Sequence, residues 1–218
     1  MIQYFENFIS KYHQSDLYDE IFNDRTFLWQ FKQYTSSGPQ QDYGWVEDAN
    51  TEDAPQLVHV IKQDTKDMAL VTPIIYKIME TLNTKITIQR MKINMMWPNA
   101  SQKNPDSYNR PHADHGRPDA MTLIYYVNDA DGDTILFDKF YTGENPEPLS
   151  IVQRFRPKQG DAILFDSIRY HASSTPSTGY RSVINFIFWP QEENKLPDGA
   201  PSIPDIWVEG AQGYMVRI

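Results

Sequence analysis

The sequence predicts a mainly β protein with flanking helices, of the α+β type, whose core is a two-sheet jelly roll or barrel. Three observations favour this fold. First, from residue 85 onward apolar side chains come in short runs, several of which alternate with polar residues. Second, Gly- and Pro-rich turns separate these runs. Third, an amphipathic helical segment precedes them. With 218 residues, of which 40% are hydrophobic and 13% aromatic, the chain is long enough for one domain with a substantial core.

Three regions are expected along the chain: a helical and irregular support region at 1–84, the strand-rich core at 85–189, and a Pro-rich, irregular extension at 190–218. The clearest helix of the first region should begin with Thr72 as N-cap and Pro73 at the first helical position, and should end at Asn83. The polar stretch at 40–55 is expected to be a long loop, either a binding loop or an ordinary surface loop.

Strands are predicted at residues 85–97, 121–128, 134–137, 151–156, 162–165 and 181–189. The last of them alternates, and one side is entirely apolar. That side should pack beneath the helix, and it carries Ile184, Phe186 and Phe188.

The opposite side of the last strand carries Arg181 and Asn185, which should point into the barrel. A buried guanidinium needs an anion, because an unpaired buried charge is very costly. The anion for Arg181 is either a protein carboxylate or the carboxylate of a bound ligand, which Arg recognises through two parallel hydrogen bonds. Asn185 either lines the pocket or satisfies a neighbouring backbone group.

The composition excludes several classes of site. Without cysteine there are no disulfides, zinc–thiolate sites, Fe–S clusters or Cys nucleophiles, so a metal must be held by His and carboxylate. A net charge of −9 argues against nucleic acid as a partner. The N-terminus has no signal-peptide pattern and no apolar run reaches membrane-spanning length, so a soluble, intracellular, cytoplasmic protein is expected.

The best candidate for chemistry is the pair His112 and Asp114. On an extended backbone, side chains at i and i+2 point the same way, so both can reach one ion. His171 is the best candidate for a third ligand, and two His with one carboxylate form the facial triad of non-haem Fe(II) oxygenases. By itself a His-x-Asp pair is a weak signal, since it also occurs in solvated surface loops.

The motifs taken together resemble a known family. They are His112-x-Asp114, the strand at 124–128, the segments at 132–137 and 157–165, His171, and the segment at 179–183. In this order they resemble the 2-oxoglutarate- and Fe(II)-dependent dioxygenases, in particular the prolyl-4-hydroxylase-like branch, over residues 85–189. The resemblance implies a double-stranded β-helix, a cupin-like jelly roll.

The resemblance also implies roles for individual residues. Fe(II) would be ligated by His112, Asp114 and His171, and 2-oxoglutarate would be held by Arg181 with help from Tyr126 and Asn185. The metal ligands and Arg181 would form the catalytic set, with O₂ as the second cosubstrate and ascorbate as an optional reductant. The implied reaction is the hydroxylation of an unactivated C–H, in a prolyl residue of a peptide or in a free amino acid, with succinate and CO₂ as coproducts.

Two alternatives stay open at this stage. One is a hydroxylase or demethylase of another small molecule or of a nucleobase. The other is a jelly-roll binding protein without turnover, against which the presence of all four catalytic residues argues. The identity of the substrate and the oligomeric state are left undetermined.

Overall fold

The computed structural model describes residues 1–35, 53–62, 66–99, 106–144, 148–191, 207–209 and 215–217, with the backbone alone in the last two ranges. Its elements in chain order are β1 (Ile2–Phe5), α1 (Lys11–Phe22), β2 (Gln30–Lys32), β3 (Gln56–Val60), α2 (Lys66–Leu82), β4 (Ile86–Met96), β5 (Met121–Tyr126), β6 (Thr134–Phe140), β7 (Ile151–Phe155), β8 (Ala162–Asp166), β9 (Arg169–Ser173), β10 (Arg181–Pro190), β11 (Trp207–Glu209) and β12 (Met215–Arg217). The loop predicted at 40–55 lies mostly outside the described residues and stays a prediction.

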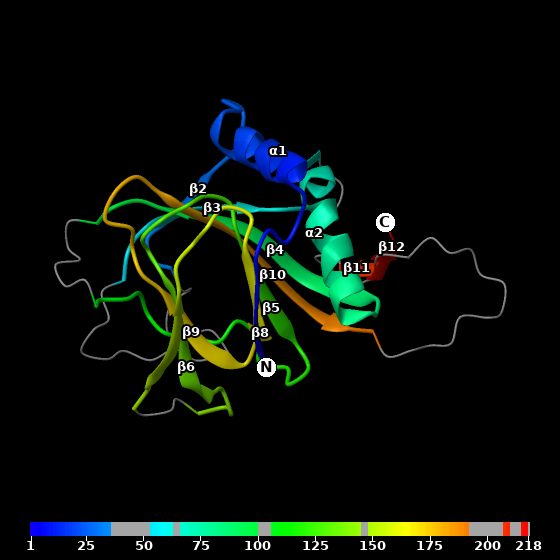
Figure 1. The fold of residues 1–218 in the computed structure, drawn as a ribbon. Coiled ribbons are helices and arrows are strands. Elements are labelled where there is room, and N and C mark those ends of the chain that lie inside the picture. Colours follow the sequence, from blue (N-terminus) through cyan, green and yellow to red (C-terminus); the bar gives the residue numbers. More distant parts are fainter. Residues whose placement is uncertain are drawn as a thin grey trace, which may run out of the picture.

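The strands form two sheets that face each other (Figure 1). Within the described residues the larger sheet has the order β1-β8-β5-β10-β4-β11-β12, and β3 also pairs with β4 and with β2. The smaller sheet has the order β7-β6-β9. The described strand pairs are antiparallel except for β11 with β4. This is the predicted double-stranded β-helix.

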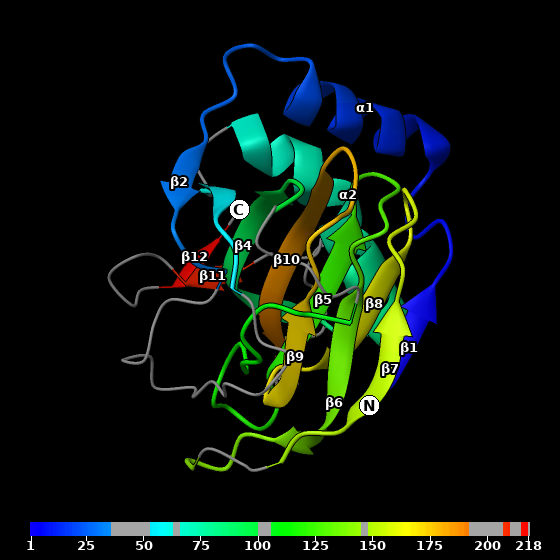
Figure 2. The ribbon, with the colours of Figure 1, turned by 90° about the vertical axis from the view of Figure 1, so that its left-hand side faces the viewer.

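The helices cover the face of the larger sheet that is turned away from the smaller sheet (Figures 1 and 2). The apolar side of β10 packs there against α2, as predicted from its alternation. The main buried contacts of this layer come from Val71, Ile74, Ile75 and Ile78 of α2 and from Ile184, Phe186 and Phe188 of β10. The opposite side of β10 is thereby left to face the interior between the two sheets.

Helix α2 begins earlier than predicted. It starts at Lys66, and Pro73 lies inside it, so the proposal of Thr72 as N-cap is wrong. Thr72 instead donates its hydroxyl to the carbonyl of Met68, at 2.7 Å. An interior proline costs about 3 kcal/mol of helix stability, and burial of the first turns against the sheet offsets that cost. The predicted end is right, since Asn83 adopts a positive φ of 49° directly after the helix.

A β-bulge in β4 decides which of its side chains face the interior. The register with β10 shifts so that Ile187 pairs with Arg90 and Phe188 with Ile88, which leaves Gln89 as an extra residue. Because side chains alternate with period two, one extra residue reverses the faces. Ile88 before the bulge and Met91 after it therefore share the helix-covered core, and Arg90 is turned to the opposite face.

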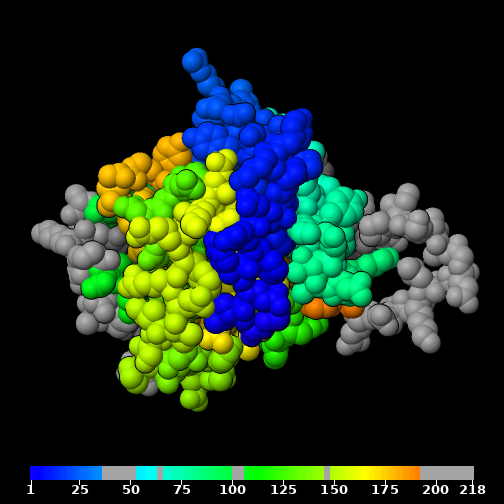
Figure 3. Space-filling view, in the orientation of Figure 1, coloured from blue at the N-terminus to red at the C-terminus, as the bar shows by residue number. Residues whose placement is uncertain are grey.

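The terminal regions contain more strand than the sequence predicts. The region at 1–84, expected to be helical and irregular, also supplies β1, β2 and β3. β1 forms the edge next to β8, and Figure 3 shows this blue segment running down the molecule beside α2. In the extension at 190–218, expected to be irregular, β11 pairs parallel with β4. None of the helices in the described ranges is both long and apolar enough to cross a membrane.

Candidate metal centre

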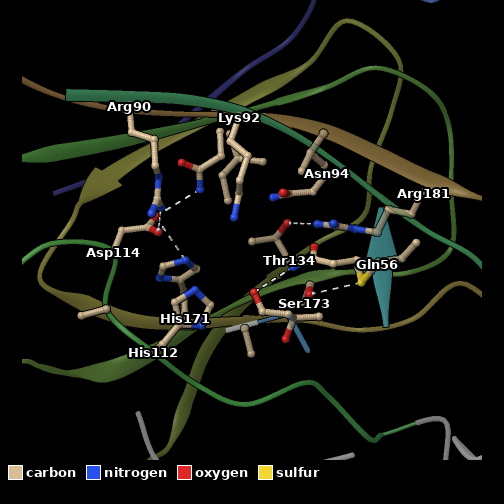
Figure 4. Close-up of a pocket in the computed structure, with 17 residues that line it drawn as sticks. Gln56, Arg90, Lys92, Asn94, His112, Asp114, Thr134, His171, Ser173 and Arg181 are labelled. Atoms are coloured by element: carbon tan, nitrogen blue, oxygen red, sulfur yellow. Dashed lines mark hydrogen bonds and ion pairs between the residues drawn. The ribbon is translucent and has the colours of Figure 1, made fainter. Parts of the chain in front are cut away.

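His112, Asp114 and His171 converge at one end of the space between the sheets (Figure 4). His171 lies on β9, a strand that the sequence did not predict. The backbone of His112 pairs with that of His171 through two N–H···O bonds of 2.9 Å, and the Asp114 N–H donates to the carbonyl of Ser167 at 2.9 Å. One ligand atom of each of the three side chains lies within 4.8 Å of the others. The i, i+2 geometry expected for the pair is present.

Both imidazoles are oriented by a backbone carbonyl two residues earlier in the chain. Nδ1 of His112 lies 3.1 Å from the carbonyl oxygen of Arg110, and Nδ1 of His171 lies 3.2 Å from that of Arg169. A proton on each Nδ1 donates to the carbonyl, which leaves Nε2 with a free lone pair. Nε2 of His171 lies 3.4 Å from Oδ2 of Asp114. Two imidazole nitrogens and a carboxylate oxygen are thus presented to one point, which suits a divalent transition metal.

The Asp114 carboxylate is held by three further groups. Nη2 of Arg90 lies 2.9 Å from Oδ1, which makes an ion pair. The Thr122 hydroxyl donates to Oδ2 at 3.0 Å, and Nδ2 of Asn185 donates to the same oxygen at 3.1 Å. Of the two alternatives for Asn185, the side chain lines the pocket and contacts a carboxylate, not a backbone group.

The electrostatics of the site keep its groups in metal-binding form. Burial alone would raise the pKa of Asp114, but the neighbouring His171 and the positive charge of Arg90 hold that pKa well below its usual range. Burial, with His171 nearby, lowers the pKa of His112 to about 4. At neutral pH the carboxylate is therefore ionised and the His112 imidazole neutral, which are the states that bind metal.

Thr122→Val should weaken metal binding by about tenfold without unfolding the protein, because removing a group that orients a ligand typically costs about 10–100-fold in affinity. Valine keeps the shape of the buried threonine but donates nothing to Asp114. Titration with Mn(II), followed by its electron paramagnetic resonance, measures the effect. Thr87→Val, the same change at a buried threonine on β4 bonded to Gln191, is the matched control. Equal losses in both variants would contradict a role for Thr122.

Arg181 lies at the other end of the same pocket and is buried. Its Nε donates to the carbonyl of Gly132 at 2.8 Å, and its Nη2 donates to the Thr134 hydroxyl at 2.7 Å. A side chain on Gly132 would lie 2.5 Å from the carbonyl of Ser174, so only glycine allows this close approach. No carboxylate in the described ranges forms an ion pair with Arg181. Its remaining N–H groups are available to an anionic ligand.

Tyr126 belongs to β5, and its strand neighbour in the β10 register is Val183, two residues from Arg181. The Tyr126 hydroxyl is buried near the Thr134 hydroxyl, and no described residue makes a hydrogen bond of good geometry with it. Burial raises the pKa of this phenol, and the charge of Arg181 and the Thr134 hydroxyl act in the opposite direction. A neutral phenol donor therefore lies in the Arg181 region, where a bound carboxylate would satisfy it.

The pocket between the metal-ligand cluster and Arg181 also contains residues that sequence reasoning missed. They are Gln56 and Thr134 together with the β4 side chains Arg90, Lys92 and Asn94. A signal for the β4 set was present, since charged and amide side chains alternate there with apolar ones in a strand next to the core. The strand at 85–97 was predicted, but its polar side was not assigned to the site.

No protein-family model matches the sequence, and no curated protein matches it. Among solved structures, the chain is similar to the epimerase SnoN from nogalamycin biosynthesis, in complex with Fe³⁺, α-ketoglutarate and nogalamycin RO. The TM-score is 0.59 and the sequence identity 10%, and the alignment covers 93% of this chain and 88% of SnoN. A Trichoplax adhaerens prolyl hydroxylase, in complex with a hypoxia-inducible-factor peptide, has a TM-score of 0.56 at 14% identity, over 87% and 83% of the two chains. The viral collagen prolyl hydroxylase of Paramecium bursaria Chlorella virus 1, in its 2-oxoglutarate complex, has a TM-score of 0.50 at 14% identity, over 87% and 96%.

The fold is that of the 2-oxoglutarate/Fe(II) oxygenases. This confirms the fold predicted from the resemblance, although sequence identity is at most 14% in these three comparisons. The similar structures include an epimerase in complex with the small molecule nogalamycin RO and a prolyl hydroxylase in complex with a peptide. The shared oxygenase fold therefore leaves the substrate to be argued from the side chains of this chain.

Proposed function

We propose that this protein is a 2-oxoglutarate- and Fe(II)-dependent dioxygenase that hydroxylates an unactivated C–H bond. In the reaction, 2-oxoglutarate, O₂ and the substrate C–H become succinate, CO₂ and the hydroxylated product. The observation that carries the proposal is one pocket with His112, Asp114 and His171 at one end and, at the other, Arg181, which pairs with no carboxylate of the described residues. The first end suits a metal and the second suits a dicarboxylate.

The residues present fit both groups. Fe(II) would be held by Nε2 of His112, Nε2 of His171 and a carboxylate oxygen of Asp114, and it would supply the O₂-dependent oxidation that couples decarboxylation of 2-oxoglutarate to hydroxylation. Arg181 would bind the distal carboxylate of 2-oxoglutarate through a two-pronged contact. Tyr126 would add a hydrogen bond to the same group.

The chain's own residues also set the environment of the reaction. Arg90 and Thr122 keep the Asp114 carboxylate in one orientation. Apolar side chains, Ile124 and Val183, line the wall of the pocket and limit access of water to the reacting centre. We propose that the group hydroxylated is a prolyl residue in a peptide or a free amino acid. Support comes from the resemblance to the prolyl-4-hydroxylase-like branch and from the similarity in fold to prolyl hydroxylases.

Anaerobic addition of Fe(II) and 2-oxoglutarate to the purified protein tests this function. We expect a visible metal-to-ligand charge-transfer band that needs both additions. On admission of O₂, succinate should form, and it should form faster with a prolyl peptide or free proline present. Absence of the band at saturating Fe(II) and 2-oxoglutarate would refute the proposed function, whatever the substrate.

A further inference from the structure

The pocket is strongly cationic for an acidic protein. Among the described residues that line it, the charged side chains other than His are Arg90, Lys92, Arg181 and Asp114, so three cations share one carboxylate. The whole chain carries a net charge of −9. Positive charge is therefore concentrated at the site, and it attracts anions against the field of the rest of the molecule.

Lys92 is the cation in this pocket that lacks a partner. Arg90 pairs with Asp114, and Arg181 donates to Gly132 and Thr134. The ammonium of Lys92 makes no hydrogen bond or ion pair with any described residue, and Figure 4 shows it pointing into the pocket between the Asp114 and Asn94 sides. Burial and the charge of Arg90 lower the pKa of Lys92 to about 8, which reflects a cation held without an adequate counterion.

Asn94, two residues further along β4, is also incompletely bonded. Its Oδ1 is buried and accepts no hydrogen bond from the described residues. Lys92 and Asn94 are two residues apart on regular strand and share a face, so an ammonium donor and an amide acceptor lie side by side in the pocket. A ligand that offers a carboxylate together with an N–H or O–H donor would satisfy both.

Metal and cosubstrate do not remove this surplus of positive charge. If the proposed function holds, the charges of Fe(II) and Arg181 are balanced by Asp114 and by the two carboxylates of 2-oxoglutarate. Among the described residues that line the pocket, no further carboxylate then remains for the positive charges of Arg90 and Lys92, because Asp114, the ion-pair partner of Arg90, is also matched by the metal. A substrate with an anionic group would neutralise part of this excess.

We propose that Lys92, backed by Arg90 and flanked by Asn94, binds the carboxylate of a small anionic substrate. The inference rests on the proposed function and narrows it, from a prolyl peptide or a free amino acid to a free amino acid or a related small carboxylic acid. The peptide group at an internal prolyl residue is uncharged and would leave Lys92 unpaired. An unpaired, partly desolvated ammonium opposes binding of a neutral substrate.

Carbon-13 lysine spectra test the inference, with propionate and its uncharged analogue propionamide as probes. The protein is loaded first with Zn(II), which does not turn over, and then with saturating 2-oxoglutarate. The side-chain signal of Lys92 is assigned by its loss in Lys92→Met. We expect propionate, and not propionamide, to shift this signal and to raise the pKa of Lys92 from about 8 towards the ordinary lysine value of about 10.4. The exposed Lys66 on α2, which pairs with Glu20 and Asp24 and does not line the pocket, provides an internal control in the same spectra and should not respond.

Each outcome decides the assignment. A Lys92 signal that ignores propionate, or responds equally to propionamide, overturns the inference. A Lys92 signal that moves on addition of 2-oxoglutarate, and then no further with propionate, assigns the lysine to the cosubstrate and also overturns it. If the protein binds neither metal nor 2-oxoglutarate but the Lys92 signal still responds to propionate, the carboxylate site is supported. The proposed function is then rejected instead.

Discussion

His112→Ala should abolish tight binding of Fe(II) or Mn(II), with a loss larger than the roughly 10–100-fold that removal of a supporting residue causes. The variant removes one of the three donors that converge within 4.8 Å, and Asp114 and His171 alone offer an incomplete set. The His112 side chain is half-buried, and its Nδ1 bonds to the backbone carbonyl of Arg110, two residues earlier. Because this contact is local, the fold should persist in the variant. Mn(II) titration by electron paramagnetic resonance measures the affinity, and circular dichroism confirms folding.

The matched control is His115→Ala. His115 lies one residue after Asp114, but its Nδ1 accepts the N–H of Arg117 and its ring lies beside Trp189. It belongs neither to the ligand cluster nor to the residues that line the pocket. Loss of an imidazole there should leave Mn(II) affinity unchanged. If His112→Ala binds Mn(II) as tightly as His115→Ala does, the proposed ligand set is wrong.

Arg181→Ala should reduce the affinity for 2-oxoglutarate while metal binding is retained. Loss of one partner of a buried, charge-assisted contact costs about 2–5 kcal/mol, which corresponds to roughly thirtyfold to several thousandfold in affinity. The residue lies at the end of the pocket away from the metal ligands and bonds to Gly132 and Thr134. Anaerobic titration of the charge-transfer band with 2-oxoglutarate measures the loss.

Two further variants sharpen this prediction. Arg181→Lys should lie between wild type and Arg181→Ala, because lysine offers a point charge in place of a planar fork. Arg117→Ala removes an exposed guanidinium paired with Asp119 and should leave the titration unchanged. Equal 2-oxoglutarate affinity in wild type and Arg181→Ala would remove the cosubstrate assignment and much of the case for the oxygenase.

The candidate site was predictable from the sequence where local periodicity determines it. His112 and Asp114 are two residues apart on extended backbone, and Arg181 and Asn185 are an even number of residues apart on one strand. Such spacing places side chains on one face wherever the strand is regular and carries no bulge between them. The structure brings these residues to one pocket. The start of α2 was mispredicted, because the local signal of Thr72-Pro73 was overridden by burial of the first turns against the sheet.

What the sequence by itself determined is therefore the strand-rich core, the parity of β10 and the identity of the metal-ligand candidates. Only the tertiary structure placed Arg90 on Asp114, 24 residues away, and brought the polar side of β4 to the metal-ligand cluster. The bulge at Gln89, which lets Ile88 and Met91 share the helix-covered side, is visible only in the register of β4 with β10. The physical reason is that alternation is a property of one strand, whereas register and bulges arise from pairing with residues that are distant in the sequence.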